Sequence, residues 1–159
     1  MQLFPIPPFG MTWKKFRIMS DSKKNKVHLY LKFYDINVHP DEISKALNLE
    51  PTRKGLKGEK FYIGTKKKIE RKYSSNWWQF GQKYDVNGKW PQEFIDQFTE
   101  EIIEPRKNEI KDIIAIGDGE LSVCPYFYND TNPGFHFEHR VLKVISEANL
   151  PINMDIYCL

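Results

Sequence analysis

Two histidines three residues apart, His136 and His139, come closest to a reactive site by residue type and spacing. On a helix, side chains at this spacing share a face and could together bind a metal ion. The surrounding residues match neither HExxH nor HxxEH, the patterns of zinc proteases. No third ligand stands close by, and Glu120, Asp118 and Asp130 are candidates by residue type alone. A small metal-dependent enzyme using His136 and His139 stays an alternative, but we expect structural histidines at a helix start and no metal.

The two cysteines, Cys124 and Cys158, fall on expected strands. Neither has the helix N-terminus or neighbouring base that activates a thiol, so we expect both to be unreactive. Two cysteines form neither a disulfide framework nor a zinc set and are typical of a reducing compartment, which predicts a cytoplasmic protein. No window approaches the ~18–20 apolar residues of a membrane span. No glycine pattern matches a phosphate loop. We therefore expect no enzymatic activity, no cofactor and no membrane contact.

A basic segment at residues 53–72 dominates the charge distribution. It holds nine lysines and arginines against two glutamates, a net charge of +7 in a chain whose total is +3. Residues 14–26 add +5, so the remainder carries −9. The segment could be a solvated loop that balances the acidic body, a contact for an acidic protein surface, or a nucleic-acid site. In the last case Phe61, Tyr62 and Tyr73 would stack on bases, but no nucleic-acid-binding motif accompanies them.

Two adjacent tryptophans, Trp77 and Trp78, lie in an aromatic stretch at 76–84 that reads as a strand. Because side chains alternate between the faces of a strand, one of the two rings must point away from the core. An outward ring beside the basic segment is a candidate contact for another protein. The predicted partner is a protein, such as a toxin, or another acidic surface, and the predicted protein-binding residues are Tyr62, Lys66, Lys67, Lys68, Trp77 and Trp78.

These residues must be positioned by elements organised around 27–51. Apolar residues alternate through a strand, which places one of its faces on the core; they are Val27, Leu29, Leu31 and Phe33. His39-Pro40-Asp41-Glu42 marks a helix start, because proline suits the first helical position and acidic side chains oppose the positive end of the helix dipole. We expect this helix to run to about Leu49, with Ile43, Ala46 and Leu47 on one side.

The rest of the chain alternates loops, strands and helices. Segment 53–72 reads as a long loop or a protruding hairpin with 60–63 extended. We then expect a strand at 76–84, a helix from Pro91 that breaks at Pro105, a helix at 105–115, a turn at 117–119, a strand at 120–128, a helix at 137–149 and a strand at 151–159. Both halves, 27–84 and 120–159, contain a strand–helix–strand unit. This predicts an α+β fold, a mostly antiparallel sheet with helices packed on one face, ferredoxin-like and built from a duplicated unit.

Several segments together resemble a bacterial family called domain of unknown function 4279. In chain order they are the strand at 30–33, HPDEISKALNLEPT at 39–52, KGEKF at 57–61, the tryptophan strand at 77–80, EIIEPRKNEIKDI at 101–113 and ISEANLPINMDIY at 145–157. Their order and spacing carry the resemblance. It implies a small cytosolic bacterial domain without an established activity. By analogy with immunity proteins, which bind and block a toxin, we expect a binding module. Residues 1–26 lie outside the resemblance. We expect them to form an N-terminal arm that precedes a single domain at 27–159.

Overall fold

The main sheet is built around β1 (Lys26–Ile36), which has an antiparallel partner on each side. The computed structural model describes residues 24–64, 69–128 and 134–159, so most of the expected N-terminal arm lies outside the described residues. β1 pairs with β5 (Asn76–Asp85) on one side and with β6 (Asp118–Phe127) on the other. Val27, Leu29 and Leu31 are fully buried, as the alternating pattern predicted.

Shorter strands extend the sheet at both edges. β2 (Arg53–Gly55) pairs antiparallel with β5. β7 (Ile152–Met154) and β8 (Tyr157–Cys158) run parallel to β6. A separate hairpin consists of β3 (Lys60–Ile63) and β4 (Ile69–Lys72). The predicted α+β class with a mostly antiparallel sheet is therefore confirmed.

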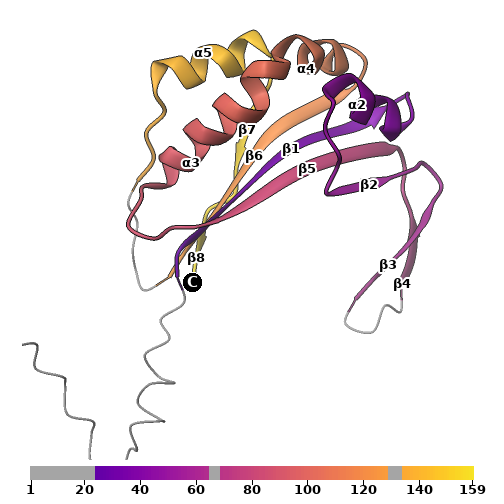
Figure 1. Ribbon diagram of the computed structural model, residues 1–159. Helices are drawn as coiled ribbons and strands as arrows, with labels where there is room; N and C mark the ends of the chain where they lie inside the picture. The colour runs from indigo at the N-terminus through magenta and orange to yellow at the C-terminus, as the bar shows by residue number, and fades with distance from the viewer. Residues whose placement is uncertain (1–23, 65–68, 129–133) are drawn as a thin grey trace, which may run out of the picture.

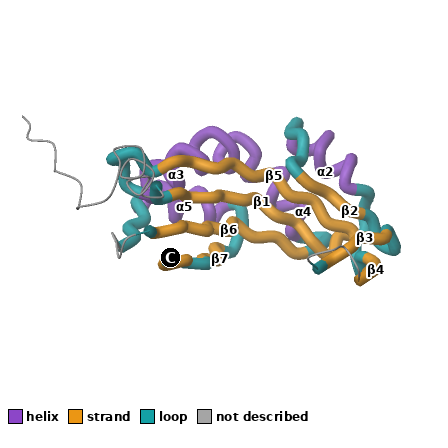
Figure 2. The backbone as a smooth tube through the Cα atoms, turned by 90° about the horizontal axis from the view of Figure 1, so that it is seen from below, coloured by secondary structure: helices purple, strands orange, loops and turns teal. Residues whose placement is uncertain are grey.

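The helices cover one face of this sheet only, as predicted. They are α2 (Pro40–Leu47), α3 (Pro91–Phe98), α4 (Lys107–Ile114) and α5 (His139–Glu147). All four lie above the strands in Figure 1, and Figure 2 shows the opposite face with the helices behind it. No helix in the described ranges has the length and apolar character needed to cross a membrane.

Two strand–helix–strand units interleave within the sheet. The first unit consists of β1, α2 and β2, and its two strands lie on either side of β5. The second unit consists of β5, the helices α3 and α4, and β6, and its two strands lie on either side of β1. A ferredoxin-like arrangement requires a split unit of this kind. Here β7 and β8 extend the sheet further and α5 adds another helix, so the ferredoxin-like fold stays a prediction. The halves defined from the sequence are not equivalent, since β1 and β5 pair antiparallel whereas β6 and β7 pair parallel.

The helix break predicted at Pro105 is confirmed and is spread over two turns. α3 continues into a π-helical turn at Thr99–Ile103 and a 3-10 turn at Glu104–Arg106 before α4 begins. Proline has no N–H to donate to the carbonyl four residues earlier. The Arg106 side chain donates instead, from Nη1 to the Glu101 oxygen at 3.1 Å, while its Nε reaches the Leu47 oxygen at 2.7 Å. Arg106 thereby links the break to α2.

Three local expectations were wrong. Ala46 is exposed, and α2 ends at Leu47 because Asn48 adopts a left-handed conformation with φ 47°. Residues 117–119 were expected to turn, yet β6 already begins at Asp118. Gly119 serves close packing there, since a Cβ would lie 2.8 Å from Cδ1 of Phe33 on β1.

Candidate functional site: a basic hairpin on an aromatic base

The β3–β4 hairpin projects from the sheet on the side away from the helices (Figure 1). We call the paired residues 60–63 and 69–72 the basic hairpin. For 53–72 the sequence predicted a long loop or a protruding hairpin. The structure contains a hairpin, with 60–63 extended as expected, but 53–55 form β2 of the main sheet. Tyr62 is 53% exposed and Ile69 is 50% exposed, and Ile63 is exposed beside them. The predicted contacts Lys66, Lys67 and Lys68 lie outside the described residues.

An aromatic stack joins the hairpin to the sheet. Phe61 lies face to face with Tyr73, at 4.4 Å between ring centroids and 13° between planes. Tyr73 meets the edge of Trp77 at 5.4 Å, and the guanidinium of Arg53 lies 5.7 Å from the Trp77 ring. These contacts are worth about 0.5–1.5 kcal/mol per aromatic pair beyond area burial. We call Phe61, Tyr73, Trp77 and Arg53 the aromatic base.

Gly55 makes room for this base. A Cβ at this position would lie 2.7 Å from Cε2 of Tyr73 and 2.9 Å from Cε2 of Trp77. Real Cβ atoms do not approach so closely, so a larger residue would displace the rings. No pattern in the sequence indicates a role for Gly55. Its role follows from the pairing of Gly55 with Trp77 across β2 and β5, a register that no sequence pattern revealed.

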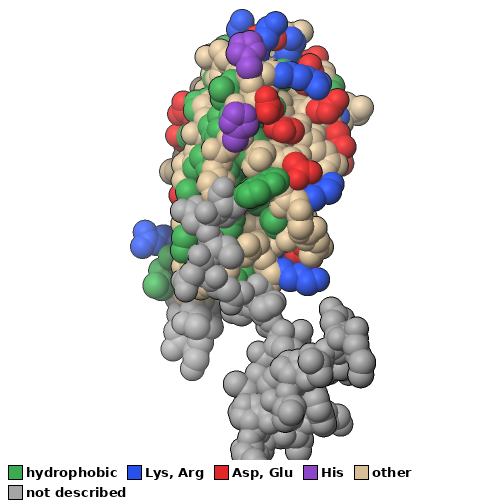
Figure 3. All heavy atoms as spheres, turned by 90° about the vertical axis from the view of Figure 1, so that its left-hand side faces the viewer, with side chains coloured by type: hydrophobic (Ala, Val, Ile, Leu, Met, Phe, Trp, Pro, Cys, Tyr) green, Lys and Arg blue, Asp and Glu red, His purple; other side chains and the backbone are tan. Residues whose placement is uncertain are grey.

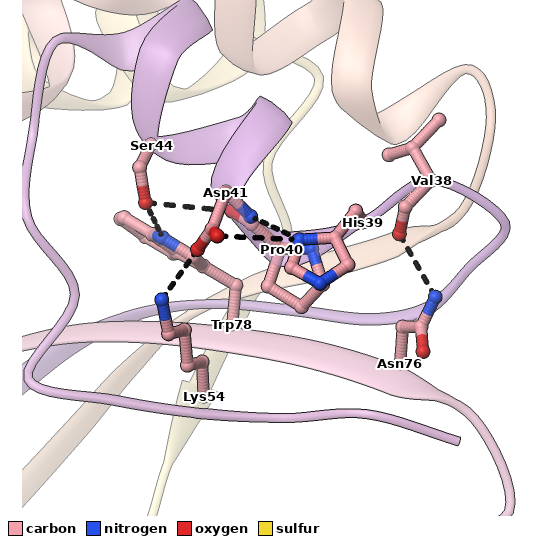
Figure 4. Close-up of polar contacts among 8 residues, drawn as sticks. All are labelled: Val38, His39, Pro40, Asp41, Ser44, Lys54, Asn76 and Trp78. Carbon is pink, nitrogen blue, oxygen red and sulfur yellow. Dashed lines mark hydrogen bonds and ion pairs between the residues drawn. The ribbon is translucent and has the colours of Figure 1, made fainter.

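Trp77 and Trp78 point to opposite faces of β5, as predicted. Trp78 is 0% exposed; its ring packs 5.6 Å from that of Phe33, and its Nε1 donates to Ser44 Oγ at 3.0 Å (Figure 4). Trp78 therefore belongs to the core beneath α2, which removes it from the predicted contact residues. Trp77 is half-buried on the open face. Its Nε1 has no acceptor in the described part of the chain.

Asn76 ties the hairpin's base to the start of α2. Its Nδ2 donates to the Val38 oxygen at 2.9 Å (Figure 4), and its Oδ1 accepts from the Lys57 N–H at 2.8 Å. At the start of α2, His39 Nδ1 caps the helix by accepting from the Asp41 N–H at 3.2 Å. The hairpin therefore rises from a fixed platform.

Some of the cations around the hairpin are neutralised and others are not. Lys54 pairs with Asp41, and this hydrogen bond holds the pKa of the Asp41 carboxyl below its usual range (Figure 4). Lys60 pairs with Glu70 at 3.0 Å. By contrast Lys57, Arg71 and Lys72 form no ion pair among the residues that the structure describes, so positive charge is in surplus on the hairpin and beside it.

The middle of the open face satisfies its own polar groups. Lys32 Nζ lies 3.0 Å from Glu120 Oε1 and 3.0 Å from Ser122 Oγ. Tyr126 and Tyr157 stack at 4.7 Å between ring centroids. These groups have partners already, so the hairpin and its base are the part of this face best suited to bind another molecule.

The histidine pair does not form the helical site considered from the sequence. The expected helix over 137–149 is wrong at its start: α5 begins at His139, and His136 lies in an extended segment. The segment is extended because Phe135 and Phe137 alternate inward against the core. His136 Nε2 lies 3.3 Å from Glu138 Oε1. Within residues 24–64, 69–128 and 134–159, no three His, Cys, Asp or Glu side chains are grouped to hold a metal ion.

Comparison with known proteins shows the family of this chain. A family model described as a domain of unknown function, DUF4279, matches residues 25–159, which is nearly the whole described chain. This confirms the resemblance stated from the sequence. Neither the curated proteins nor the solved structures contain a match.

Proposed function

Because the chain belongs to the family of domains of unknown function DUF4279, whose description states no activity, we propose its function from the geometry: it is a non-enzymatic binding module that docks on an acidic surface of another protein. The proposed contacts are the basic hairpin, with Tyr62 and Ile69, and the outward Trp77. The predicted contacts Lys66, Lys67 and Lys68 belong to the same proposal by sequence alone, since they lie outside the described residues.

The exposed apolar side chains of the hairpin carry this proposal. A two-stranded hairpin is marginally stable by itself in water. Here it displays Tyr62, Ile63 and Ile69 to solvent instead of packing them on the body of the protein. Exposed apolar residues grouped on a protruding element are typical of a protein interface, and aromatic residues often supply most of the binding energy.

The unpaired cations suggest the charge of the partner. Lys57, Arg71 and Lys72 add positive charge beside the apolar residues, and opposite charges on a partner would speed association. Nucleic acid suits this surface less well. Phe61 and Tyr73 are half-buried and each covers one face of the other ring, so Tyr62 is the one well-exposed ring among the three considered for stacking on bases.

An immunity-type role is a finer form of the same proposal. Such a protein blocks a toxin by occupying its surface, and a hairpin that protrudes on a fixed platform could enter a cleft that a flat surface would miss. In this form the partner is a toxin and Trp77 lies at the edge of the contact. The geometry requires no catalytic residue, metal or cofactor in the binding protein.

A pair of double variants tests the proposal. Tyr62→Ser with Ile69→Ser removes apolar surface from the hairpin, and Ile116→Ser with Leu142→Ser removes similar exposed surface elsewhere. Tagged proteins are incubated with extracts of cells that naturally contain the chain, and the bound molecules are identified by mass spectrometry. We expect the wild type and the Ile116/Leu142 control to retain the same protein and the hairpin variant to lose it.

Salt and nuclease controls identify the kind of partner. If opposite charges steer a protein partner to the hairpin, added salt should slow its association, and nuclease treatment should not release it. Retention by the hairpin variant at the wild-type level would contradict the proposed surface. Release of all bound material by nuclease would show that the partner is nucleic acid.

A further inference from the structure

A cavity of about 260 Å³ lies in the helical layer, away from the basic hairpin. One wall comes from the end of α3, the π-helical turn and the start of the 3-10 turn, and the other from α5 with the residue before it. Figure 3 shows this end of the molecule, where acidic side chains gather beside histidines. We call it the acidic cavity. Its volume is slightly below the roughly 300–1,000 Å³ of ordinary ligand pockets, which suits a small ligand.

Carboxylates outnumber cations around the acidic cavity. Asp96, Glu100, Glu104 and Glu138 line it, with Arg140 as the only cation in its wall among the described residues. Arg140 Nη2 is already held by two of them, at 2.8 Å from Glu104 Oε2 and 3.4 Å from Glu100 Oε1. These two glutamates neutralise the arginine, so the cavity keeps an excess of negative charge.

Two buried oxygens at the cavity have no hydrogen-bond partner in the described part of the chain. Thr99 is 3% exposed and its Oγ1 is unpartnered, and so is Oδ1 of Asp96 three residues earlier. Leaving such groups unpaired is costly, so each needs an explanation. Burial and the nearby Glu138 carboxylate raise the pKa of Asp96, an effect that His136 opposes. Thr99 also opens the π-helical turn, a feature frequent at functional sites.

A ligand with hydrogen-bond donors and a positive charge would suit both these oxygens and the surplus carboxylates. An ammonium group has three donors and would satisfy Asp96 and Thr99 while offsetting the surplus carboxylates. Val141 and Val144 form the apolar part of the wall and suit a short hydrocarbon chain. A metal ion is a poorer fit, because no three ligating side chains converge within the described ranges.

We propose that the acidic cavity binds a small primary alkylammonium ion, with its N–H groups on Asp96 and Thr99 and its methylene groups against Val141 and Val144. The site is independent of the basic hairpin. It would give the protein a second ligand, a free amine, beside its proposed protein partner.

Three small probes test the proposal on the full chain by amide chemical-shift titration in moderate salt. They are n-butylammonium, the neutral isostere n-butanol, and tetramethylammonium, a cation without N–H donors. We expect n-butylammonium to shift residues of α3, the π-helical turn and α5 with a dissociation constant of about millimolar, a range accessible to such small ligands. The other two probes should bind about tenfold more weakly or not at all.

Variants separate the site from general electrostatics. Asp96→Asn removes the proposed carboxylate acceptor, and Thr99→Val removes the proposed hydroxyl acceptor. The matched control is Glu101→Gln: Glu101 is an exposed carboxylate in the same turn as Thr99, but it does not line the cavity. We expect Asp96→Asn to weaken n-butylammonium by about tenfold or more, Thr99→Val by less, and Glu101→Gln not at all.

Three results would overturn the proposal: no shifts around the cavity with n-butylammonium at tens of millimolar, equal binding of the three probes, or equal weakening by Asp96→Asn and Glu101→Gln. If a variant fails to fold, the comparison of the three probes on the wild type decides the question.

Discussion

Alanine substitution of the two adjacent tryptophans should separate the two faces of β5. Trp78 is fully buried, packs against Phe33 and donates a hydrogen bond to Ser44. Trp78→Ala therefore leaves a large cavity and removes the hydrogen bond that Trp78 Nε1 donates to Ser44 Oγ. Core tryptophans replaced by alanine cost about 3–5 kcal/mol of unfolding free energy, and we expect Trp78→Ala to fall within this range.

Trp77→Ala should cost less. The Trp77 ring is half-buried and loses an edge contact with Tyr73, worth about 0.5–1.5 kcal/mol, and a cation–π contact with Arg53, worth about 0.5–1 kcal/mol. Its N–H has no acceptor within the described residues, so no hydrogen bond is lost. These two contacts account for about 1–2.5 kcal/mol. The apolar area that the half-buried ring covers adds to this loss, but by less than the full burial of Trp78 contributes.

Urea unfolding followed by far-ultraviolet circular dichroism measures both losses without relying on tryptophan fluorescence. With an m-value of about 2 kcal/mol/M, a difference of about 2 kcal/mol separates the two midpoints by about 1 M. Trp77→Ala should also weaken binding of the partner more than its small stability loss explains. Equal destabilisation by the two variants would refute the reasoning, because it would make Trp77 a structural residue like Trp78.

Three further substitutions have defined outcomes. Gly55→Ala should lower stability by about 1–3 kcal/mol, because the added Cβ overpacks against Trp77; an unchanged urea midpoint would contradict this packing. Thr99→Val should leave stability unchanged or raise it by up to about 1 kcal/mol in the same assay, since it replaces an unpartnered hydroxyl; a clear loss would reveal a hydrogen bond. The raised pKa of Asp96 means that its carboxyl holds its proton more tightly in the folded state than in the unfolded one. The stability that the protonated carboxyl contributes is therefore present below its ordinary pKa of 3.8 and is lost as the pH rises through the folded-state pKa. Asp96→Asn should therefore gain thermal stability relative to the wild type between about pH 3 and pH 7; a difference that is constant across this range would contradict the assignment.

The parts of the fold that follow from local patterns could be predicted from the sequence. Alternation from Val27 to Phe33 identified the central strand, and Pro105 located the break between two helices. The adjacent tryptophans required one ring to leave the core. In each case a short-range rule, the period of a strand or the missing N–H of proline, determines the outcome.

The parts that depend on long-range packing could not be predicted. Gly55 acquires its role only when β2 pairs with β5, and Gly119 only when it faces Phe33 on β1. The acidic cavity brings together Asp96 and Glu138, which are far apart in the sequence. No sequence pattern marks Thr99, because the π-helical turn that it opens was not predictable from the helical periodicity.

Site-specific photo-crosslinking tests the binding surface most directly. A photoreactive phenylalanine derivative is placed at Tyr62 on the basic hairpin or, as a control, at Leu142 on α5; both positions are exposed. After irradiation in cells that naturally contain the chain, the proposal predicts one crosslinked protein from position 62 that is absent from position 142. Crosslinking of the same protein from position 142 and not from position 62 would contradict the claim that the hairpin is the binding surface.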